Sequence, residues 1–285
     1  MITGALPPEA IVPPVRLALE EDRAWNDATT AAAVPPEMQG AAMVLAKDDG
    51  VIAGLGVAAA AFAEMDNTLV FRQQIADGGR IGRGQAIATV RGRLAPILSA
   101  ERVAINFLQR LSGVATTAAR AVRAVEGTNA VILDTRKTTP GLRALEKYAV
   151  RCGGAQSHRM DLSDAILLKD NHLVATKLQG LSLGDMVRRA AADANGLSVE
   201  VEVTRITEAE EALAAGATRL LLDNMSPSEM ATVVELARGR ATTEASGGIT
   251  LDNVRAVAET GVDFISMGSL THSVKALDIS LELIF

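Results

Sequence analysis

Cationic side chains gather in the middle of the chain, after two short apolar runs at residues 130–133 and 165–168. They are Arg136, Lys137, His158, Arg159 and Lys169. Arginine and lysine bind carboxylate and phosphate groups through charge-assisted hydrogen bonds, and the planar guanidinium fork matches a carboxylate in particular. Because the protein as a whole is acidic, with a formal net charge of −6, this local concentration of cations predicts a site for a small anionic molecule.

Carboxylates follow the next two apolar runs, at Glu202 and Asp223. Side chains alternate along Val199–Val203, so Glu200 and Glu202 share one face of a strand and the valines share the other. We expect Glu200 to lie deeper and to form a salt bridge with a lysine or arginine. Glu202, at the rim, could bind a ribose hydroxyl or the shell of a Mg²⁺ ion. Each acid could equally be a structural charge that a neighbour satisfies.

Small turns that contain glycine follow the last two apolar runs. Their residues are Ser246, Gly247, Gly248, Gly268 and Ser269. Glycine lets backbone N–H groups approach an oxyanion closely, and we expect the first turn to lead directly into a helix that begins at Thr250 and ends at Gly261. Two such turns, opposite the cations, predict a 5′-phosphate site. The earlier Gly82 and Gly84 precede a strand, so we expect a β-turn there.

The elements that must position these side chains are repeated units, each a short apolar run followed by a helical segment. Six runs are recognisable, and the last four end at Glu202, Asp223, Ser246 and Gly268. The intervals between those ends are 21, 23 and 22 residues, which matches the βα unit of a parallel barrel. We therefore predict an α/β fold with an incomplete β/α barrel, since six strands are fewer than the eight of a closed one.

Helix signals lie between these runs. Ser226, Pro227 and Glu229 form the pattern of a capping box with proline at the first helical position. Thr204–Ala215 has apolar residues at helical spacing with acids on the opposite face. These helices support the count of βα units independently of the strands.

The first 70 residues have weaker signals. We expect a helix over Pro14–Glu21 and a mixture of strands and tight turns over Val34–Met65. A turn over Asp77–Gly84 should lead into a strand that starts at Gln85.

Two helices are expected next, over Ala100–Leu111 and Val114–Val125, with a break at Ser112–Gly113. Ser99 is a candidate N-cap for the first helix, and Gly127 a left-handed C-cap for the second.

Composition narrows the class of protein. The acidic balance argues against general binding of nucleic acid, which needs a broad basic surface. The single cysteine, Cys152, excludes an internal disulfide and is expected to be a small buried side chain. No apolar run approaches the roughly 20 residues of a membrane span, and the first ten residues lack the pattern of an export signal. We expect a cytoplasmic protein that does not bind membranes.

The motifs resemble those of the quinolinate phosphoribosyltransferase family, also called nicotinate-nucleotide pyrophosphorylase (carboxylating). The resemblance runs in order through nearly the whole chain and is weakest before residue 70. Its motifs are Ala100-Glu-Arg102, Asp134-Thr-Arg-Lys-Thr-Thr-Pro-Gly141, His158-Arg159, Leu168-Lys-Asp-Asn-His172, Leu222-Asp-Asn224, Ser246-Gly-Gly-Ile249 and Thr271-His-Ser273.

The resemblance implies an N-terminal α/β domain over residues 1–110 and a barrel domain over 111–285, whose final segment is free to return to the first domain. It also implies a homodimer, or a higher oligomer, in which the N-terminal domain of one subunit covers the barrel mouth of the other. Arg102 would then complete the partner's site.

The resemblance assigns roles to the clustered residues. Quinolinate would be held by Arg102, Arg136, Lys137, His158, Arg159 and Lys169. Phosphoribosyl pyrophosphate would be held by Lys137, Lys169, Glu202, Asp223, Ser246, Gly247, Gly248, Gly268 and Ser269. Mg²⁺ would be bound by Glu202 and Asp223, directly or through water, and the catalytic residues would be Lys137, Lys169, Glu202 and Asp223.

Three alternatives stay open. One is the related phosphoribosyltransferase associated with molybdate transport, which the Leu168–His172 motif disfavours. Nicotinate phosphoribosyltransferase would need fewer cations for a monocarboxylate. A non-catalytic barrel that binds phosphosugars is disfavoured because Glu202 and Asp223 would repel phosphates unless a metal intervened.

Overall fold

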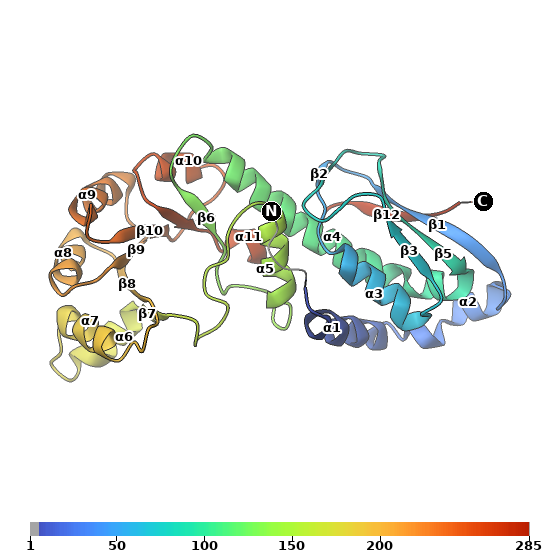
Figure 1. Ribbon diagram of the computed structural model, residues 1–285, viewed down its shortest axis with the longest axis horizontal. Helices are drawn as coiled ribbons and strands as arrows, with labels where there is room; N and C mark the ends of the chain where they lie inside the picture. Colours follow the sequence, from blue (N-terminus) through green and yellow to red (C-terminus); the bar gives the residue numbers. More distant parts are fainter. Residues whose placement is uncertain (1–5, 285) are drawn as a thin grey trace. The chain divides into compact units, whose positions relative to one another are not determined.

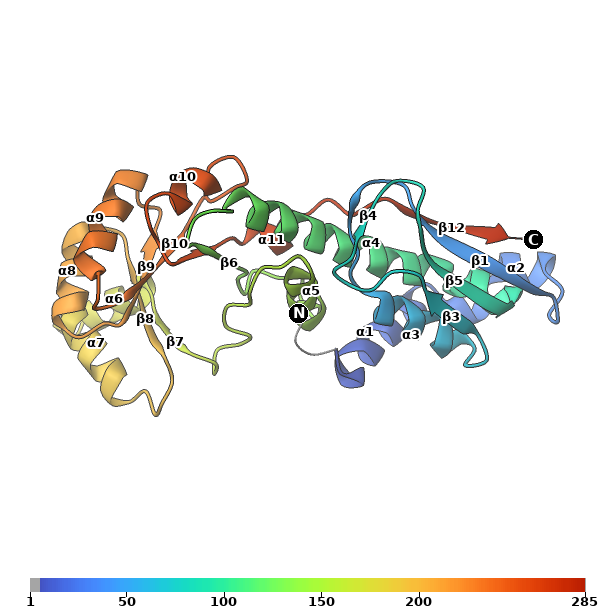
Figure 2. The same ribbon diagram turned by 45° about the horizontal axis from the view of Figure 1, so that its top comes forward.

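The computed structural model describes residues 6–284, which form two compact units (Figures 1 and 2). Unit 1 contains the chain up to Ala119, together with Thr138–Gly154 and the segment from Leu270 onward. Unit 2 contains Arg120–Lys137 and Ala155–Ser269. The interpretation of an export signal depends partly on residues 1–5, which lie outside the described residues.

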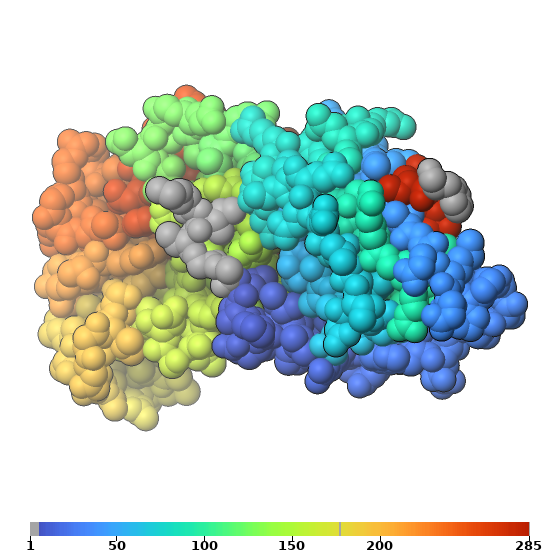
Figure 3. Space-filling model, turned by 45° about the vertical axis from the view of Figure 1, so that its right-hand side comes forward, coloured from blue at the N-terminus to red at the C-terminus, as the bar shows by residue number. Residues whose placement is uncertain are grey.

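Unit 1 is built on an antiparallel sheet with the strand order β12-β1-β5-β3. Its strands are β1 (Gln39–Ala46), β3 (Val70–Gln73), β5 (Ala86–Arg93) and β12 (Ile279–Ile284), and a small ladder joins β2 (Gly50–Val51) to β4 (Arg80–Ile81). Strand β12 pairs with β1 along its whole length, so the end of the chain returns to the first sheet. In Figure 3 the red C-terminal segment lies among blue N-terminal atoms.

Helices complete unit 1. They are α1 (Pro8–Glu21), the short η1 (Ala24–Asn26), α2 (Ala28–Ala33), α3 (Leu55–Met65), α5 (Arg143–Cys152) and the first part of α4 (Leu94–Ala124). The helix expected over Pro14–Glu21 is present and begins six residues earlier. The alternation expected over Val34–Met65 is wrong at its end, where α3 is a helix and not a strand. Its alanines favour helix, and Val57, Ala58 and Phe62 lie buried on one side.

The break expected at Ser112–Gly113 is also wrong, because α4 runs through both residues. Gly113 has a packing role: a Cβ there would lie 2.3 Å from the backbone oxygen of Lys275. Ser112 is fully buried and bonds the backbone of Ala53. Ser99 lies inside the helix and does not cap it, whereas Gly127 has the predicted left-handed φ of 82° beyond the helix end.

Unit 2 is built on a parallel sheet, and its six strands are the six predicted runs. They are β6 (Val131–Leu133), β7 (Ile166–Leu168), β8 (Val199–Val203), β9 (Arg219–Asp223), β10 (Thr242–Ser246) and β11 (Phe264–Ser266). The order is β6-β11-β10-β9-β8-β7, so the sheet ends at β6 and β7. A bridge from Leu133 to Gln156 adds to the β6 edge. Since no named ladder of the described strands joins that edge to β7, the barrel is incomplete, as predicted.

Helices follow the strands of unit 2 and cover the outside of the sheet (Figures 1 and 2). They are α6 (Asp170–Lys177), α7 (Leu183–Ala192), α8 (Ile206–Ala214), α9 (Pro227–Ala237) and α10 (Val254–Ala258), and the short α11 (Ser269–His272) begins at the end of this unit. The predicted capping box at Ser226 is present, with its hydroxyl and Glu229 bonded to each other's backbone N–H groups. None of the described helices has the length and apolar character needed to cross a membrane.

Candidate active site

Four of the predicted site residues lie at the carboxyl edge of the parallel sheet. Strand register aligns Asp223 with Ser246, and Val203 with Leu222. Lys169 follows β7, and its Nζ lies 3.9 Å from Oε2 of Glu202 on β8. The carboxyl ends of neighbouring parallel strands therefore bring an ammonium group, two carboxylates and a serine into one row.

Glu202 lies in an environment that favours binding of a cation. Burial raises the pKa of its carboxyl group, Lys169 lowers that pKa, and the nearby charge of Asp223 raises it again, with a net rise. Asp223 also accepts a 2.8 Å hydrogen bond from the Asn224 side chain. Two carboxylates near enough to repel each other, with oxygen donors only, fit a hard divalent ion such as Mg²⁺.

The first glycine turn brings backbone N–H groups to the same edge. Gly247 and Gly248 have φ values of 88° and 60°. A Cβ on Gly247 would lie 2.4 Å from Oδ1 and 2.8 Å from the backbone nitrogen of Asn224, so only glycine fits between the two strands. The helix expected to begin at Thr250 begins only at Val254 and is five residues long. An anion here would therefore be bound by the turn itself and not by a helix N-terminus.

The second glycine turn lies beside the first. Ser269 follows Gly268, and its hydroxyl donates to the backbone oxygen of Ile249 over 3.5 Å. Strand β11 pairs with β10 at Ala245 and Ile265, which fixes the two turns on adjacent strands. The predicted phosphate-binding residues are thus contiguous.

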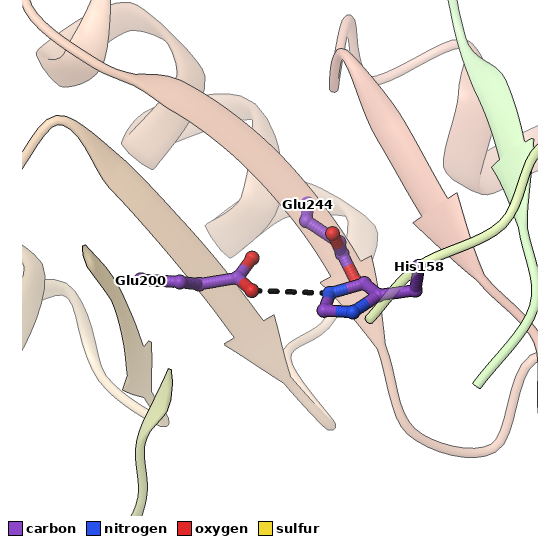
Figure 4. Close-up of side chains that lie close together, drawn as sticks. All are labelled: His158, Glu200 and Glu244. Carbon is purple, nitrogen blue, oxygen red and sulfur yellow. Dashed lines mark hydrogen bonds and ion pairs between the residues drawn. The ribbon is translucent and has the colours of Figure 1, made fainter. Parts of the chain in front are cut away.

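His158 lies deeper in the barrel, against two buried glutamates (Figure 4). Its Nε2 is 3.1 Å from Oε2 of Glu200 on β8 and 3.4 Å from Oε1 of Glu244 on β10. Its backbone N–H donates to Oδ1 of Asp134 over 2.8 Å. The expected inner salt bridge of Glu200 is also present, because Arg219 donates to Oε1 of Glu200 over 2.9 Å.

The protonation of His158 is decided by two opposing contacts. Burial lowers its pKa, but the hydrogen bonds and charges of Glu200 and Glu244 outweigh burial and raise the pKa to about 9. The backbone N–H of Arg159 points at Nδ1 over 2.7 Å, which favours a neutral ring. One neutral hydrogen bond contributes about 1 kcal/mol, less than two close carboxylates, so we assign an imidazolium.

Arg159 and Arg136 lie near each other in unit 2. Burial lowers the pKa of Arg159, and the charge of Arg136 lowers it further. Two guanidinium groups that repel each other favour a dianion between them. Arg159 also donates to the backbone oxygen of Ala165 over 3.0 Å.

A cavity of about 380 Å³ lies beside His158 and Arg159. Several lining residues start strands, namely Arg219 on β9 and Phe264 on β11, so the cavity extends toward the amino edge of the sheet. His158 and Arg159 therefore line the same cavity as Glu200, which precedes Glu202 on β8 by two residues.

Lys137 and Arg102 are both exposed and lie outside the row at the carboxyl edge. Lys137 lies in the loop after β6, where its backbone N–H donates to the Thr135 hydroxyl. Arg102, on α4 of unit 1, has a side chain that is 62% exposed and lies 3.7 Å from Glu101. Arg102 also lines a shallow groove of about 250 Å³ with Phe107 and other residues of unit 1.

Several other interpretations have clear outcomes. Cys152 is buried, and burial raises the pKa of its thiol to about 12, so it is not a nucleophile. Tyr148 is buried and its hydroxyl donates to Asp77 over 2.8 Å, whereas Trp25 is 50% exposed. The ring of His172 accepts a hydrogen bond from the backbone N–H of Lys169, so this side chain caps the start of α6.

Sequence reasoning missed Glu244 and Arg219. Both lie inside runs that were read as apolar strands, and both are part of the His158 cluster. A charge at an inward position of a buried strand is the signal that could have identified them, because such charges are almost always paired.

Comparison with known proteins covers nearly the whole chain. Residues 27–112 match the family model "Quinolinate phosphoribosyl transferase, N-terminal domain", and residues 114–282 match the model of the C-terminal domain. A quinolinate phosphoribosyltransferase [decarboxylating] of Nicotiana tabacum is 41% identical over 94% of this chain and 81% of its own length. A probable nicotinate-nucleotide pyrophosphorylase [carboxylating] of Bacillus subtilis is 43% identical over 85% of this chain and 82% of its own.

A solved structure has the same fold. The nicotinate-nucleotide pyrophosphorylase from Francisella tularensis superposes with a TM-score of 0.92 at 35% identity, over 98% of both chains.

Proposed function

The chain belongs to the quinolinate phosphoribosyltransferase family, and on that premise we propose how its residues carry out the decarboxylating transfer. The reaction joins quinolinate to phosphoribosyl pyrophosphate and yields nicotinate mononucleotide, pyrophosphate and carbon dioxide, a step of NAD biosynthesis. The observation that supports the proposal is the row of Lys169, Glu202 and Asp223 at the carboxyl edge of the parallel sheet whose strand β8 also carries Glu200, the partner of His158.

Quinolinate is held by the guanidinium groups of Arg136 and Arg159 and by the imidazolium of His158. Each guanidinium can bind one carboxylate through two parallel hydrogen bonds. The charge of Arg136 at Arg159 supports this role, because two like charges in a partly buried place are stabilised by a bound dianion. Lys137 follows β6 and Lys169 follows β7. Their ammonium groups bind either a carboxylate of quinolinate or the pyrophosphate.

Phosphoribosyl pyrophosphate lies along the carboxyl edge. Its 5′-phosphate is bound by the turns at Ser246–Gly248 and Gly268–Ser269, and its ribose hydroxyls by Glu202 and Asp223. These two carboxylates would also hold Mg²⁺, which when bound neutralises the leaving pyrophosphate. Lys169 adds a fixed positive charge to the same leaving group, and Glu202 supports the positive sugar that develops as the bond to pyrophosphate breaks.

The second half of the reaction needs no covalent nucleophile. Once the ring nitrogen carries ribose, its positive charge stabilises the carbanion that remains at C2 when the 2-carboxylate departs as carbon dioxide, and addition of a proton at C2 completes nicotinate mononucleotide. The residues around the dicarboxylate therefore need only orient the ring.

We further propose that the enzyme is a cytoplasmic homodimer in which Arg102 completes the partner's site. The exposed guanidinium of Arg102 beside an apolar groove with Phe107 supports this assignment, because an arginine beside exposed apolar surface is typical of interface residues.

Replacing Arg136 or Arg159 by alanine tests the quinolinate contacts. Each change should raise the KM for quinolinate about 10- to 100-fold, since a hydrogen bond to a charged group contributes roughly 1.5–3 kcal/mol. The KM for phosphoribosyl pyrophosphate should stay within a factor of two or so. Arg188→Ala, on the exposed surface of α7, is the matched control. An unchanged KM for quinolinate in both variants would remove these two residues from the dicarboxylate site.

A further inference from the structure

The cluster around His158 contains a buried glutamate, Glu244, to which the proposed reaction assigns no contact with either substrate. Glu244, in the middle of β10, is 0% exposed, and it lies 75 positions after Lys169, the last in sequence of the predicted quinolinate-binding residues. Its Oε2 accepts a hydrogen bond from Nη2 of Arg219. Its Oε1 is buried and lies 3.4 Å from Nε2 of His158, without a well-aligned hydrogen bond.

Arg219 holds the two buried carboxylates in place. Its Nε bonds Glu200, its Nη2 bonds Glu244, and its guanidinium stacks on the ring of Phe264 with 4.6 Å to the centroid. Burying two carboxylates is expensive unless both are paired and hydrogen-bonded. Here one guanidinium bridges the pair, so the two carboxylates form a rigid notch across β8 and β10.

The ring of His158 lies in that notch, and the residue is held at three points. Nε2 meets Glu200 and Glu244, and the backbone N–H donates to the fully buried Asp134. The notch therefore sets the position of the ring, and the anchored backbone of His158 leads directly into Arg159, the next residue of the chain.

We propose that Glu244, together with Glu200 and Arg219, is a positioning residue that fixes His158, and through it Arg159, for binding of the pyridine dicarboxylate. The inference rests on the proposed function. Groups that hold a binding residue from behind commonly contribute as much as a direct contact, because binding falls steeply when a charged partner moves by even an ångström.

A metal ion is the competing occupant of this cluster, since ligand atoms of His158, Glu200 and Glu244 all lie within 4.8 Å of one another. Arg219 argues against it, because its guanidinium already bonds both carboxylates and would repel a divalent cation at close range. The positive charges of Arg219 and His158 already balance the two carboxylates, so the cluster does not need a metal ion.

Glu244→Gln tests the proposal, because the amide keeps the shape and loses the charge. We expect the KM for quinolinate to rise about tenfold, with the KM for phosphoribosyl pyrophosphate unchanged. In a His158→Ala background the same change should have no further effect on quinolinate, because the residue through which Glu244 acts is gone. Glu235→Gln, at an exposed ion pair on α9, is the control.

The outcomes separate the hypotheses. A purely structural role would lower the melting temperature and impair both substrates, in both backgrounds, and would overturn the proposal. Activity that depends on added Zn²⁺ and is lost in the variant would favour a metal site instead. If Glu244→Gln fails to fold, Arg219→Lys replaces it, because lysine keeps the charge but cannot bond both carboxylates at once. It is then compared in the unaltered and His158→Ala backgrounds, with the same expected results. If the unaltered enzyme does not turn over quinolinate, the proposed function fails before this inference is reached.

Discussion

Replacing Lys169 by alanine is expected to lower kcat/KM for the complete reaction by about 10³-fold, close to what removal of one preorganised charge at a reacting group causes. Lys169 Nζ is 3.9 Å from Glu202, whose side chain is only 12% exposed and which feels the charge of Asp223. Without the ammonium group, two carboxylates face the leaving pyrophosphate with one cation fewer. Steady-state kinetics with each substrate varied in turn measures the loss.

The control is Lys47→Ala, which removes an ammonium group from the sheet of unit 1, where Lys47 pairs with Glu282. It should leave the kinetics unchanged. A Lys169→Ala enzyme that keeps more than about a tenth of its kcat/KM would show that this lysine does not act on the reacting groups.

Mixing inactive Arg102→Ala and Lys169→Ala enzymes is expected to restore activity. Lys169 lies in the barrel, and Arg102 lies on an exposed face of α4 in unit 1. If each site takes its barrel from one subunit and Arg102 from the other, a mixed dimer has one site with both changes and one with neither. Random exchange would make half of the dimers mixed, and recovery should approach about a quarter of normal activity.

The measurement is turnover after the two variants are unfolded and refolded together, compared with each variant refolded alone. Tagged copies of the two variants allow mixed dimers to be purified and assayed directly. Purified mixed dimers without activity would show that Arg102 serves its own barrel or none.

The strands of the second half of the chain could be predicted because each βα unit contains a short apolar run that ends at a polar residue or a glycine. The regular spacing of Glu202, Asp223, Ser246 and Gly268 predicted four consecutive strands, and all four are present in one parallel sheet. A buried parallel strand is a short apolar run that ends at a polar residue, so both the core and the carboxyl edge can be read from sequence.

The first half was harder because its signals are determined by tertiary contacts. Ser112 and Gly113 read as a helix break, yet α4 continues because a buried serine hydroxyl bonds the backbone of Ala53 and the glycine leaves room for the backbone at Lys275. Alanine-rich α3 carries almost no amphipathic pattern, since it is apolar on nearly all sides.

The positions of the residues at the carboxyl edge could be predicted from the sequence, whereas the deeper cluster around His158 could not. Residues at the ends of strands, such as Lys169 and Asp223, can be recognised because each is a polar residue that directly follows an apolar run. Glu244 and Arg219 lie within strands, and their meaning depends on a partner that sequence spacing does not reveal, namely the ring of His158 in the notch between β8 and β10.

The most direct test is to compare two substrates that differ by one carboxylate. With phosphoribosyl pyrophosphate and Mg²⁺ present, quinolinate should yield nicotinate mononucleotide and an equal amount of carbon dioxide, whereas nicotinate should yield nothing detectable. Carboxyl-labelled quinolinate, with product followed by chromatography and released label by trapping, gives both quantities in one experiment. Turnover of nicotinate at a comparable rate would contradict a site built from paired guanidinium groups for a dicarboxylate.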